Sequence, residues 1–373
     1  MDFEFSEEQN ALRDAVARWV ERDFAFERRH AMAKAGGASR EVYRELAALG
    51  LAGLAVAPEH GGLGFGAVEA MVVMEELGRG LVHAPYAAAA LASPALIAQG
   101  SAEVQAAWLP RIAEGTALVV PALQEQGARY RLDAVSTTAV QQAGGWALSG
   151  RKHLAPAGDE ADAFLVNARM GPHAVSPTGL FLVERARSQV RGYPTADGAR
   201  AADVTLAASP ATLVLADALP ALELAQDVLI AAACAEGVGA MDRLLAITVE
   251  YMNTRRQFGQ TLASFQALRH RVADVKMQLE LARSMSYFAS LRLGESAPQR
   301  RRALAQAKLQ LGQSMRFVGQ QCIQLHGGIG VTDECSASHY FKRLTMLEFV
   351  GGDTLHHLGE VSARMADTAG VFA

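Results

Sequence analysis

Long helical segments joined by short breaks dominate the C-terminal part of the chain. The first runs from about Leu222 to near Arg255, the second covers roughly residues 265–293, and the third covers residues 298–325. The breaks lie at residues 259–261 and 294–296. Because short connections make consecutive helices lie antiparallel, we expect this region to form a helix bundle.

The N-terminal region also shows helical patterns. The stretch Ser6-Glu7-Glu8-Gln9 has the form of a capping box, in which the first and last side chains satisfy backbone groups at the start of a helix. A second helix is expected through residues 41–49 and a third through residues 68–77. Helical signals continue to about Ile112.

The pattern changes between about Val119 and Pro220. Short apolar runs, such as those at residues 164–166 and 180–183, alternate there with glycine and proline, which is typical of β-strands separated by turns. Helices, then strands, then helices indicate an α+β fold with segregated parts rather than alternating βαβ units. We expect domains at residues 1–118, 119–222 and 223–373.

The composition excludes several classes of protein. The net charge of −4 argues against nucleic acid as an obligatory partner. Pro85 and Pro94 interrupt the longest weakly charged stretch, so we expect no membrane span. The N-terminus lacks the features of a secretory signal. The cysteines lack metal-ligand spacing and read as reduced thiols of a cytoplasmic protein; they are Cys234, Cys322 and Cys335.

The ends of the predicted bundle helices carry residue types that suit a dinucleotide. A pyrophosphate is bound by a guanidinium group, hydroxyl groups are bound by amide side chains, and close backbone approach needs glycine. No Gly-x-Gly-x-x-Gly follows a predicted strand, so a Rossmann site is not indicated. The candidate residues in the first interhelical turn, at the start of the next helix and at the end of the third helix are Arg255, Phe258, Gln266, Gln324, Gly327 and Gly328.

The relative placement of these residues bears on the kind of ligand. We expect the first interhelical turn and the end of the third helix to lie at opposite ends of the bundle. An extended cofactor, or one shared between subunits, fits that arrangement better than a compact nucleotide.

In this order and spacing, the motifs resemble those of the acyl-CoA dehydrogenase family. The motifs are Pro58-Glu59-His60-Gly61-Gly62-Leu63-Gly64, Glu75-Glu76-Leu77-Gly78, Arg255-x-x-Phe258-Gly259 with Gln266, and Gln324-Leu325-His326-Gly327-Gly328. The resemblance implies an N-terminal helical domain, a middle β-barrel-like domain and a C-terminal four-helix bundle. It also implies FAD, contacted by Arg255, Phe258, Gln266 and the segment that includes Gln324, Leu325, Gly327 and Gly328, largely across a subunit interface.

The resemblance further implies a reaction and its partners. Family members desaturate acyl-CoA thioesters: a carboxylate removes the α-proton while a hydride passes from the β-carbon to the flavin. The implied partners are an acyl-CoA substrate, electron-transfer flavoprotein as acceptor, and further subunits in a homo- or hetero-oligomer, either a dimer or a tetramer.

This chain departs from the family pattern where the catalytic base is expected. At one standard position of the glutamate the chain has Val350 or Gly351, and at the other it has Leu229. Asp353 is a weak substitute candidate whose ordinary role is to cap a helix, and the ordinary role of Glu348 is a solvated salt bridge.

The segment expected to surround the flavin ring departs as well. Pro156 stands where the family usually has a threonine, and proline has neither a hydroxyl nor an N–H group. Little of the family's preceding flavin loop remains in residues 124–130. We assign no metal site, because His326, His356 and His357 lack partners at metal-ligand spacing.

This pattern of kept and missing residues resembles that of the small subunits of bacterial heteromeric acyl-CoA dehydrogenases of the pimeloyl-CoA dehydrogenase type. Such a subunit keeps the residues that it lends to its neighbour's flavin. Two alternatives stay open: a structural partner that binds no flavin alone, and an acyl-CoA oxidase or flavin monooxygenase on the same scaffold.

Overall fold

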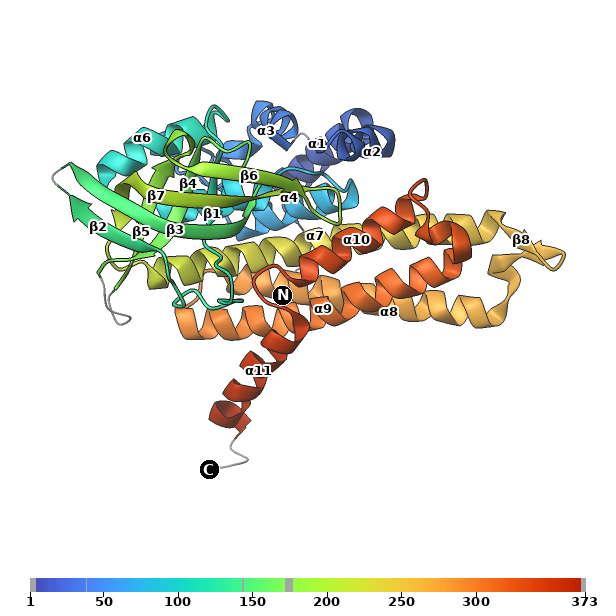
Figure 1. Cartoon of the computed structure of the whole chain (residues 1–373). Coiled ribbons are helices and arrows are strands. Elements are labelled where there is room, and N and C mark those ends of the chain that lie inside the picture. The colour runs from blue at the N-terminus through green and yellow to red at the C-terminus, as the bar shows by residue number, and fades with distance from the viewer. Residues whose placement is uncertain (1–4, 38, 143, 172–176, 370–373) are drawn as a thin grey trace. The chain divides into compact units, whose positions relative to one another are not determined.

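The computed structural model describes residues 5–37, 39–142, 144–171 and 177–369 (Figure 1). The chain forms two compact units. One comprises Met1–His30, Ala67–Val82 and Ile230–Ala373, and the other comprises Ala31–Gly66 and His83–Leu229. The three domain boundaries expected from the sequence stay a prediction, because these units group segments from different parts of the chain.

The helices of the N-terminal region agree with the sequence in all but one case. Ser6 Oγ accepts a hydrogen bond from Gln9 N at 3.1 Å and Gln9 Oε1 accepts one from Ser6 N at 3.0 Å, which confirms the capping box. Helix α2 was not expected. The helices are α1 (Glu7–Asp23), α2 (Phe26–Lys34), α3 (Ser39–Ala48), α4 (Ala67–Arg79), α5 (Ser93–Ile97) and α6 (Ala102–Ala113), with shorter turns at Leu51–Gly53 and Pro58–His60 and a π-helical turn at Ala87–Ala92.

The middle region forms a seven-stranded sheet, as its short apolar runs predicted. The strands are β1 (Val119–Ala122), β2 (Thr138–Gln142), β3 (Gly145–Pro156), β4 (Ala163–Arg169), β5 (Thr178–Glu184), β6 (Gln189–Pro194) and β7 (Arg200–Leu215), and a short 3₁₀ turn lies at Arg185–Arg187. Their order is β1-β4-β2-β3-β7-β5, and β5 also pairs with β4. This extra pairing closes the path into a ring, so the expectation of a barrel-like β-domain is confirmed.

The C-terminal helices form the expected bundle, and α8 and α9 run side by side in Figure 1. One apolar core joins buried residues of α7, α8, α9 and α10. The elements are α7 (Leu219–Thr254), the hairpin of β8 (Arg256–Gln257) and β9 (Gln260–Thr261), a 3₁₀ turn at Leu262–Ser264, α8 (Gln266–Arg292), α9 (Ala297–His326), a 3₁₀ turn at Gly327–Val331, α10 (Ser336–Glu348) and α11 (Thr354–Ala369).

Helix α10 was missed although its sequence carries a helical signal. Ala337, Tyr340, Leu344 and Leu347 recur at helical spacing, and all four are buried in the bundle core. Helix α10 is thus the fourth helix of that core.

Helices α4 and α7 cross at close range through two glycines. A Cβ atom on Gly78 would lie 2.1 Å from the carbonyl oxygen of Glu236, and one on Gly239 would lie 1.8 Å from that of Glu75. Only glycine permits so close an approach of two backbones. The Glu75-Glu76-Leu77-Gly78 motif therefore has a packing role in this fold.

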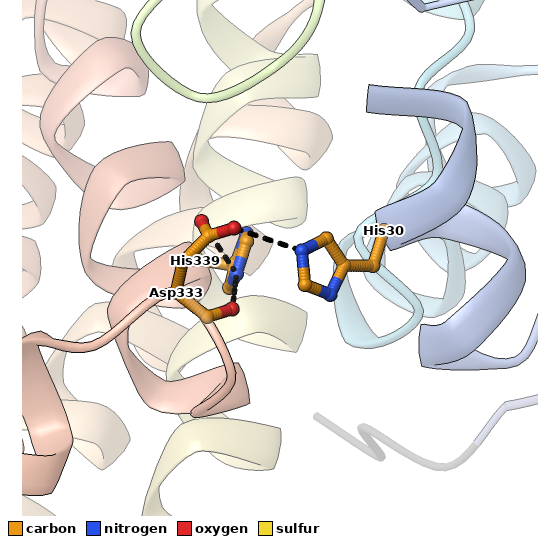
Figure 2. A group of neighbouring side chains, drawn as sticks. All are labelled: His30, Asp333 and His339. Carbon is orange, nitrogen blue, oxygen red and sulfur yellow. Dashed lines mark hydrogen bonds and ion pairs between the residues drawn. The ribbon is translucent and has the colours of Figure 1, made fainter. Parts of the chain in front are cut away.

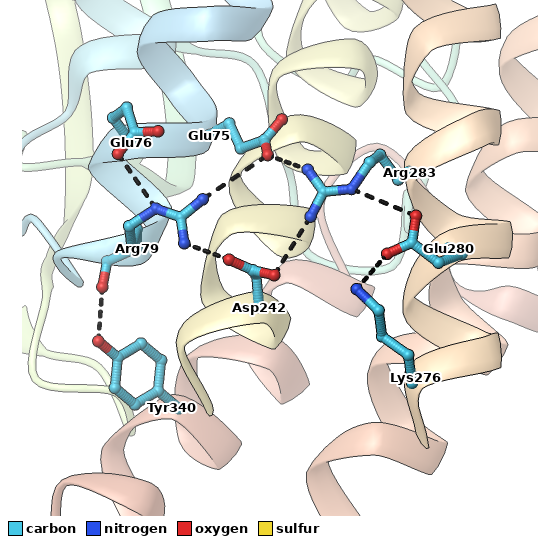
Figure 3. Close-up of polar contacts among 8 residues, drawn as sticks. All are labelled: Glu75, Glu76, Arg79, Asp242, Lys276, Glu280, Arg283 and Tyr340. Carbon is cyan, nitrogen blue, oxygen red and sulfur yellow. Dashed lines mark hydrogen bonds and ion pairs between the residues drawn. The ribbon is translucent and has the colours of Figure 1, made fainter. Parts of the chain in front are cut away.

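The same crossing carries a network of ion pairs (Figure 3). Arg79 pairs with Glu76 at 3.1 Å and with Asp242, and Arg283 pairs with Glu75 and, at 3.3 Å, with Asp242. Glu75 and Glu76 are buried, so these partners are what allow their charge inside the protein. The network ties α4, α7 and α8 together.

Candidate functional site

The two loops that carry the candidate FAD residues lie at the same end of the bundle. The ring of Tyr251, near the end of α7, stacks on that of His326, at the end of α9, with 4.7 Å between centroids. Arg271 Nη1, near the start of α8, donates to Gln321 Oε1 at 3.2 Å. The expectation of opposite ends was wrong, because an up-down-up path returns the third helix to the end where the first one stopped.

The hairpin after α7 presents an aromatic ring to solvent. Phe258 lies at its tip with φ +53° and 91% of its surface exposed. Its ring meets the edge of Phe265 at a centroid distance of 6.3 Å, just before α8 begins at Gln266. Arg255 and Gln266 are both exposed. An apolar ring held out of the core in a left-handed backbone conformation is a costly arrangement without a ligand.

The turn after α9 offers open backbone. Gly327 ends the helix with φ +67°, and a Cβ atom on Gly327 or Gly328 would meet nothing within 4 Å. Gln324 is exposed, whereas Leu325 is buried in the bundle. Of the predicted contacts in this segment, Leu325 can therefore offer its backbone but not its side chain.

We call Arg255, Phe258, Gln266, Gln324, Gly327 and Gly328 the cofactor clamp. The set combines a guanidinium group, an exposed aromatic ring, two exposed amides and unobstructed glycine backbone at one end of one bundle. These groups fit the phosphates, the adenine and the hydroxyls of a dinucleotide such as FAD.

The first position expected for the family base is occupied by Val350 or Gly351. Gly351 has φ +67°, so a side chain at this position would be strained. Asp353 Oδ1 accepts a hydrogen bond from His356 N at 2.8 Å at the start of α11. This contact is the helix cap that the sequence suggested as the ordinary role of Asp353.

Glu348 is held in place and does not lie in solvent. Its side chain is buried, accepts a hydrogen bond from Thr354 Oγ1 at 2.8 Å and pairs with Arg316. The expected salt bridge is therefore present, but its carboxylate is buried and only the Arg316 side is solvated. The carboxylate of Glu348 is thus engaged by two partners within the chain.

A buried lysine organises the same turn. Lys308 Nζ donates to the carbonyl oxygens of Leu347 at 3.0 Å, Glu348 at 2.7 Å and Gly352 at 3.0 Å. Burial lowers the pKa of Lys308 to about 8. The three carbonyls belong to the end of α10 and the turn after it, so the ammonium group fixes this turn from inside.

The second position expected for the base is occupied by Leu229. Leu229 packs against the apolar core of its unit. Glu236, further along α7, is buried and forms a two-pronged ion pair with Arg343, with Nε–Oε1 at 2.5 Å and Nη2–Oε2 at 2.9 Å. This carboxylate is committed to α10.

Two segments are expected to surround the flavin ring: the end of β3 and residues 124–130. Pro156 lies at the end of β3, paired with Ala201. Lys152 Nζ, fully buried, contacts Glu125 Oε1 at 2.6 Å and Asn167 Oδ1 at 2.7 Å. Glu125 therefore fixes residues 124–130 to β3 through its ion pair with Lys152, a contact that the sequence did not indicate.

The structure also assembles a polar cluster that the sequence did not indicate. His30 of α2 lies 2.8 Å from Asp333, which is 303 positions further along the chain, and Asp333 lies 2.8 Å from His339 of α10. Neither α2 nor α10 was predicted, so nothing in the pattern could have joined these residues.

Two family models match the chain on either side of the β-region. Residues 6–116 match the acyl-CoA dehydrogenase N-terminal domain and residues 230–366 match the acyl-CoA dehydrogenase C-terminal domain. Acyl-CoA dehydrogenase IpdE2 of Mycobacterium tuberculosis is 30% identical over 90% of this chain and 91% of its own length. The chain belongs to the acyl-CoA dehydrogenase family. Members of this family are FAD-dependent oxidoreductases, which agrees with the cofactor clamp.

Two solved structures share the fold over nearly the whole chain. The ChsE4-ChsE5 complex from Mycobacterium tuberculosis superimposes with a TM-score of 0.89 at 26% identity, covering 99% of this chain and 100% of the other. The Tcur3481-Tcur3483 steroid ACAD superimposes with a TM-score of 0.86 at 28% identity, covering 98% of this chain and 99% of the other.

Within the described residues, no helix is long and apolar enough to cross a membrane.

Proposed function

We propose that this chain is one subunit of a heteromeric acyl-CoA dehydrogenase. It lends its cofactor clamp to an FAD whose ring is surrounded mainly by a second, related chain. The second chain supplies the carboxylate that removes the α-proton of the acyl-CoA substrate. This chain then contributes binding and orientation, and it does not turn over substrate alone.

The observation that carries the proposal is the contrast between the clamp and the base turn, residues 350–353. The clamp residues are exposed at one end of the bundle. At the base turn, Asp353 caps α11, and Glu348 beside it is bound to Arg316 and Thr354. A general base needs a lone pair within hydrogen-bond reach of the substrate proton, and these carboxylates are engaged elsewhere.

Each clamp residue has a definable task toward the cofactor. When bound, FAD supplies the hydride acceptor for desaturation of the acyl chain. Arg255 would neutralise phosphate charge, the exposed ring of Phe258 would cover an apolar face, and Gln266 and Gln324 would bond to hydroxyl groups. Gly327 and Gly328 would let the backbone approach closely, since no neighbour fills the space of a Cβ.

The comparisons favour a two-component assembly. Two of the structures that share the fold are named for pairs of chains, ChsE4 with ChsE5 and Tcur3481 with Tcur3483, and the latter is called a steroid ACAD. By analogy we propose a related second chain as the partner and an acyl-CoA with a bulky acyl group as the substrate. Electron-transfer flavoprotein is the proposed acceptor.

The experiment compares the chain alone with the chain co-expressed with a family member that keeps both the glutamate and the threonine that Pro156 replaces here. We expect the chain alone to be colourless and the complex to show the visible flavin band, which acyl-CoA bleaches. A yellow chain that acyl-CoA bleaches without a partner contradicts the proposal.

A matched pair of variants locates the contact. In the complex, Arg255→Ala should lower FAD affinity about tenfold or more, as expected for a lost charge-assisted contact. Arg256→Ala removes an equally exposed guanidinium one residue away and should leave the affinity unchanged. Equal effects of the two substitutions would argue against a role of Arg255 in the clamp.

The catalytically silent alternative has a distinct signature. If the chain only completes the shape of its partner, the complex should bind FAD equally well with and without the Arg255→Ala substitution. Oxygen uptake with acyl-CoA would instead indicate the oxidase alternative.

A further inference from the structure

A set of polar side chains meets beside the segment that links the Gly327–Val331 turn to α10 (Figure 2). His30 Nε2, on α2, lies 2.8 Å from Asp333 Oδ2. His339 Nε2, on α10, lies 2.8 Å from the backbone oxygen of Asp333 and 3.5 Å from its Oδ1. Asp333 is thus held through its carboxylate and through its backbone by two different helices.

The ligand atoms of these three residues all lie within 4.8 Å of one another, a spacing that a metal ion could bridge. The contacts of His339 argue against metal binding by these three residues. Arg29 Nη1 donates to His339 Nδ1, which places the ring proton on Nε2. A metal-bound histidine needs the Nε2 lone pair and donates its other N–H to an acceptor, whereas Arg29 offers a donor.

The surrounding charges lead to the same conclusion. Arg29 is buried against His339, and Lys342 Nζ lies 3.7 Å from Asp333 Oδ1. One cation beside the carboxylate and another beside His339 disfavour a bound metal ion. The set is therefore a hydrogen-bonded network with Asp333 at its centre.

We infer that this network, formed by Arg29, His30, Asp333 and His339, positions the cofactor clamp by anchoring the downstream end of the Gly327–Val331 turn. We call it the Asp333 anchor. The inference rests on the proposed function, because Gly327 and Gly328 belong to the clamp.

The turn itself has few restraints where it carries the clamp. Space around Gly327 and Gly328 is open within 4 Å, and Ile329 and Val331 are exposed. Gly330 is buried against Ile323 and His326, which restrains the middle of the turn. Asp333 follows two residues after the turn, so fixing it limits how far the backbone of the glycines can move.

The charge state of His339 controls the anchor. Burial, and then the neighbouring Arg29 and Lys342, lower the pKa of His339, while Asp333 acts in the other direction. The groups that face its ring are Arg29 and His30 from α2, Asp333 from the linking segment, and Lys342 from its own helix. A proton on Nδ1 would remove the acceptor that Arg29 uses and place two cations in contact.

Acidification should therefore break the hydrogen bonds of the Asp333 anchor. His339 is neutral while these bonds are formed, and it takes up a proton more readily once they are broken. The hydrogen-bonded state is therefore less stable as pH falls below the ordinary pKa of histidine. The effect is local to the turn because α9 is fixed by the bundle core.

The test is hydrogen exchange of the backbone amides of residues 327–332 in the chain without cofactor. Asp333→Ala should speed this exchange about tenfold, the change expected when a hydrogen bond to a charged group is lost. Amides in the middle of α9 should not change. Glu334→Ala is the matched control, since Glu334 is the exposed neighbouring carboxylate, and it should behave as the unmodified chain.

A pH series separates positioning from a merely structural role. In the unmodified chain, exchange at the turn, corrected for intrinsic pH dependence, should rise on acidification. In His339→Gln it should stay flat, because glutamine can accept from Arg29 and donate to the Asp333 carbonyl without titrating. Parallel pH dependence in the two proteins contradicts the inference.

FAD titration of the complex completes the test. Asp333→Ala should weaken FAD binding about tenfold, and Asp333→Asn, which keeps an acceptor for His30, should restore part of the affinity. Unchanged exchange and affinity in Asp333→Ala overturn the inference. So does a rise in melting temperature on adding Zn²⁺ that His30→Ala abolishes. If no complex binds FAD, the proposed function fails, while the exchange experiment still decides the anchor.

Discussion

At Lys152, a charged side chain lies fully inside the β-region with Glu125 and Asn167 as partners. Burial alone would raise the pKa of Glu125, but the neighbouring Lys152 and the hydroxyl groups of Ser136 and Thr137 lower it to about 2. Burial lowers the pKa of Lys152 to about 8, so both members of the ion pair are charged at neutral pH. Such a pair is costly to break from one side, because the remaining charge stays buried.

Replacing one member of this pair should be more damaging than replacing both. Lys152→Met leaves Glu125 buried without its cation and should lower the free energy of unfolding by about 3–5 kcal/mol. The double variant Lys152→Met/Glu125→Gln should recover most of that loss. Urea denaturation of the three proteins measures the coupling, and additive losses in the double variant would contradict this account.

His357 should make the chain sensitive to acid. Its ring is buried, and burial, followed by the charge of Lys308 and the neighbouring His356, lowers its pKa from 6.5 to about 3. The unfolded chain binds the proton more tightly, so stability is complete above pH 6.5 and declines as pH falls toward 3. The slope from this group is at most about 1.4 kcal/mol per pH unit.

The measurement is the free energy of unfolding across that pH range. His357→Gln removes the titrating group and should show a shallower decline than the unmodified chain. His60→Gln is a control, since His60 lies on a surface turn outside the core. Identical slopes in all three proteins would show that His357 does not contribute.

At the scale of elements, helices α4 and α7 cross at close range in the bundle unit. Gly78 and Gly239 let the two backbones approach, and the ion pairs of Figure 3 surround the crossing. The sequence showed the Glu75-Glu76-Leu77-Gly78 motif but could not show its role, because the partner glycine lies on a helix far along the chain. Long-range packing of this kind leaves no periodic signal.

Gly239→Ala should therefore be strongly destabilising. The added methyl group would lie 1.8 Å from the Glu75 carbonyl oxygen, so one helix must shift. We expect a loss of about 2–3 kcal/mol, the upper range for overpacking. Gly359→Ala on α11 meets nothing within 4 Å and should be neutral or slightly stabilising. Thermal unfolding of both variants checks the contrast, and similar melting temperatures would contradict it.

The elements themselves were predictable to different degrees. The long segments now seen as α7, α8 and α9 were expected within a few residues, because their apolar periodicity continues over many turns. Helix α10 was not predicted, although Ala337, Tyr340, Leu344 and Leu347 recur at helical spacing. Helix α2 has a weak apolar pattern and buries Arg29, so its sequence gave little indication of burial.

At the scale of the whole molecule, the departures from the family pattern concern the expected base and flavin-ring positions and leave the clamp residues unchanged. The clamp residues are exposed and open, whereas the base positions hold Val350, Gly351 and Leu229. This contrast is a prediction that comes from comparing each position with a family motif. The sequence did not predict that both clamp loops share one end of the bundle, which follows from helix direction and not from residue type.

Restoring the base alone should not restore activity. Val350→Glu places a carboxylate where the side chain packs against the bundle core, and Pro156 still lacks the hydroxyl expected beside the flavin ring. We expect no acyl-CoA-dependent reduction of an artificial electron acceptor by this variant alone. Substantial turnover would show that the ring environment is adequate as it stands.

The most direct test of the account is the FAD content of the purified chain, measured with and without a co-expressed family partner that keeps the glutamate. The account predicts that the chain alone loses FAD, that the complex retains it, and that Arg255→Ala in this chain releases it while Arg256→Ala does not. A chain that retains FAD and oxidises acyl-CoA without a partner would contradict it.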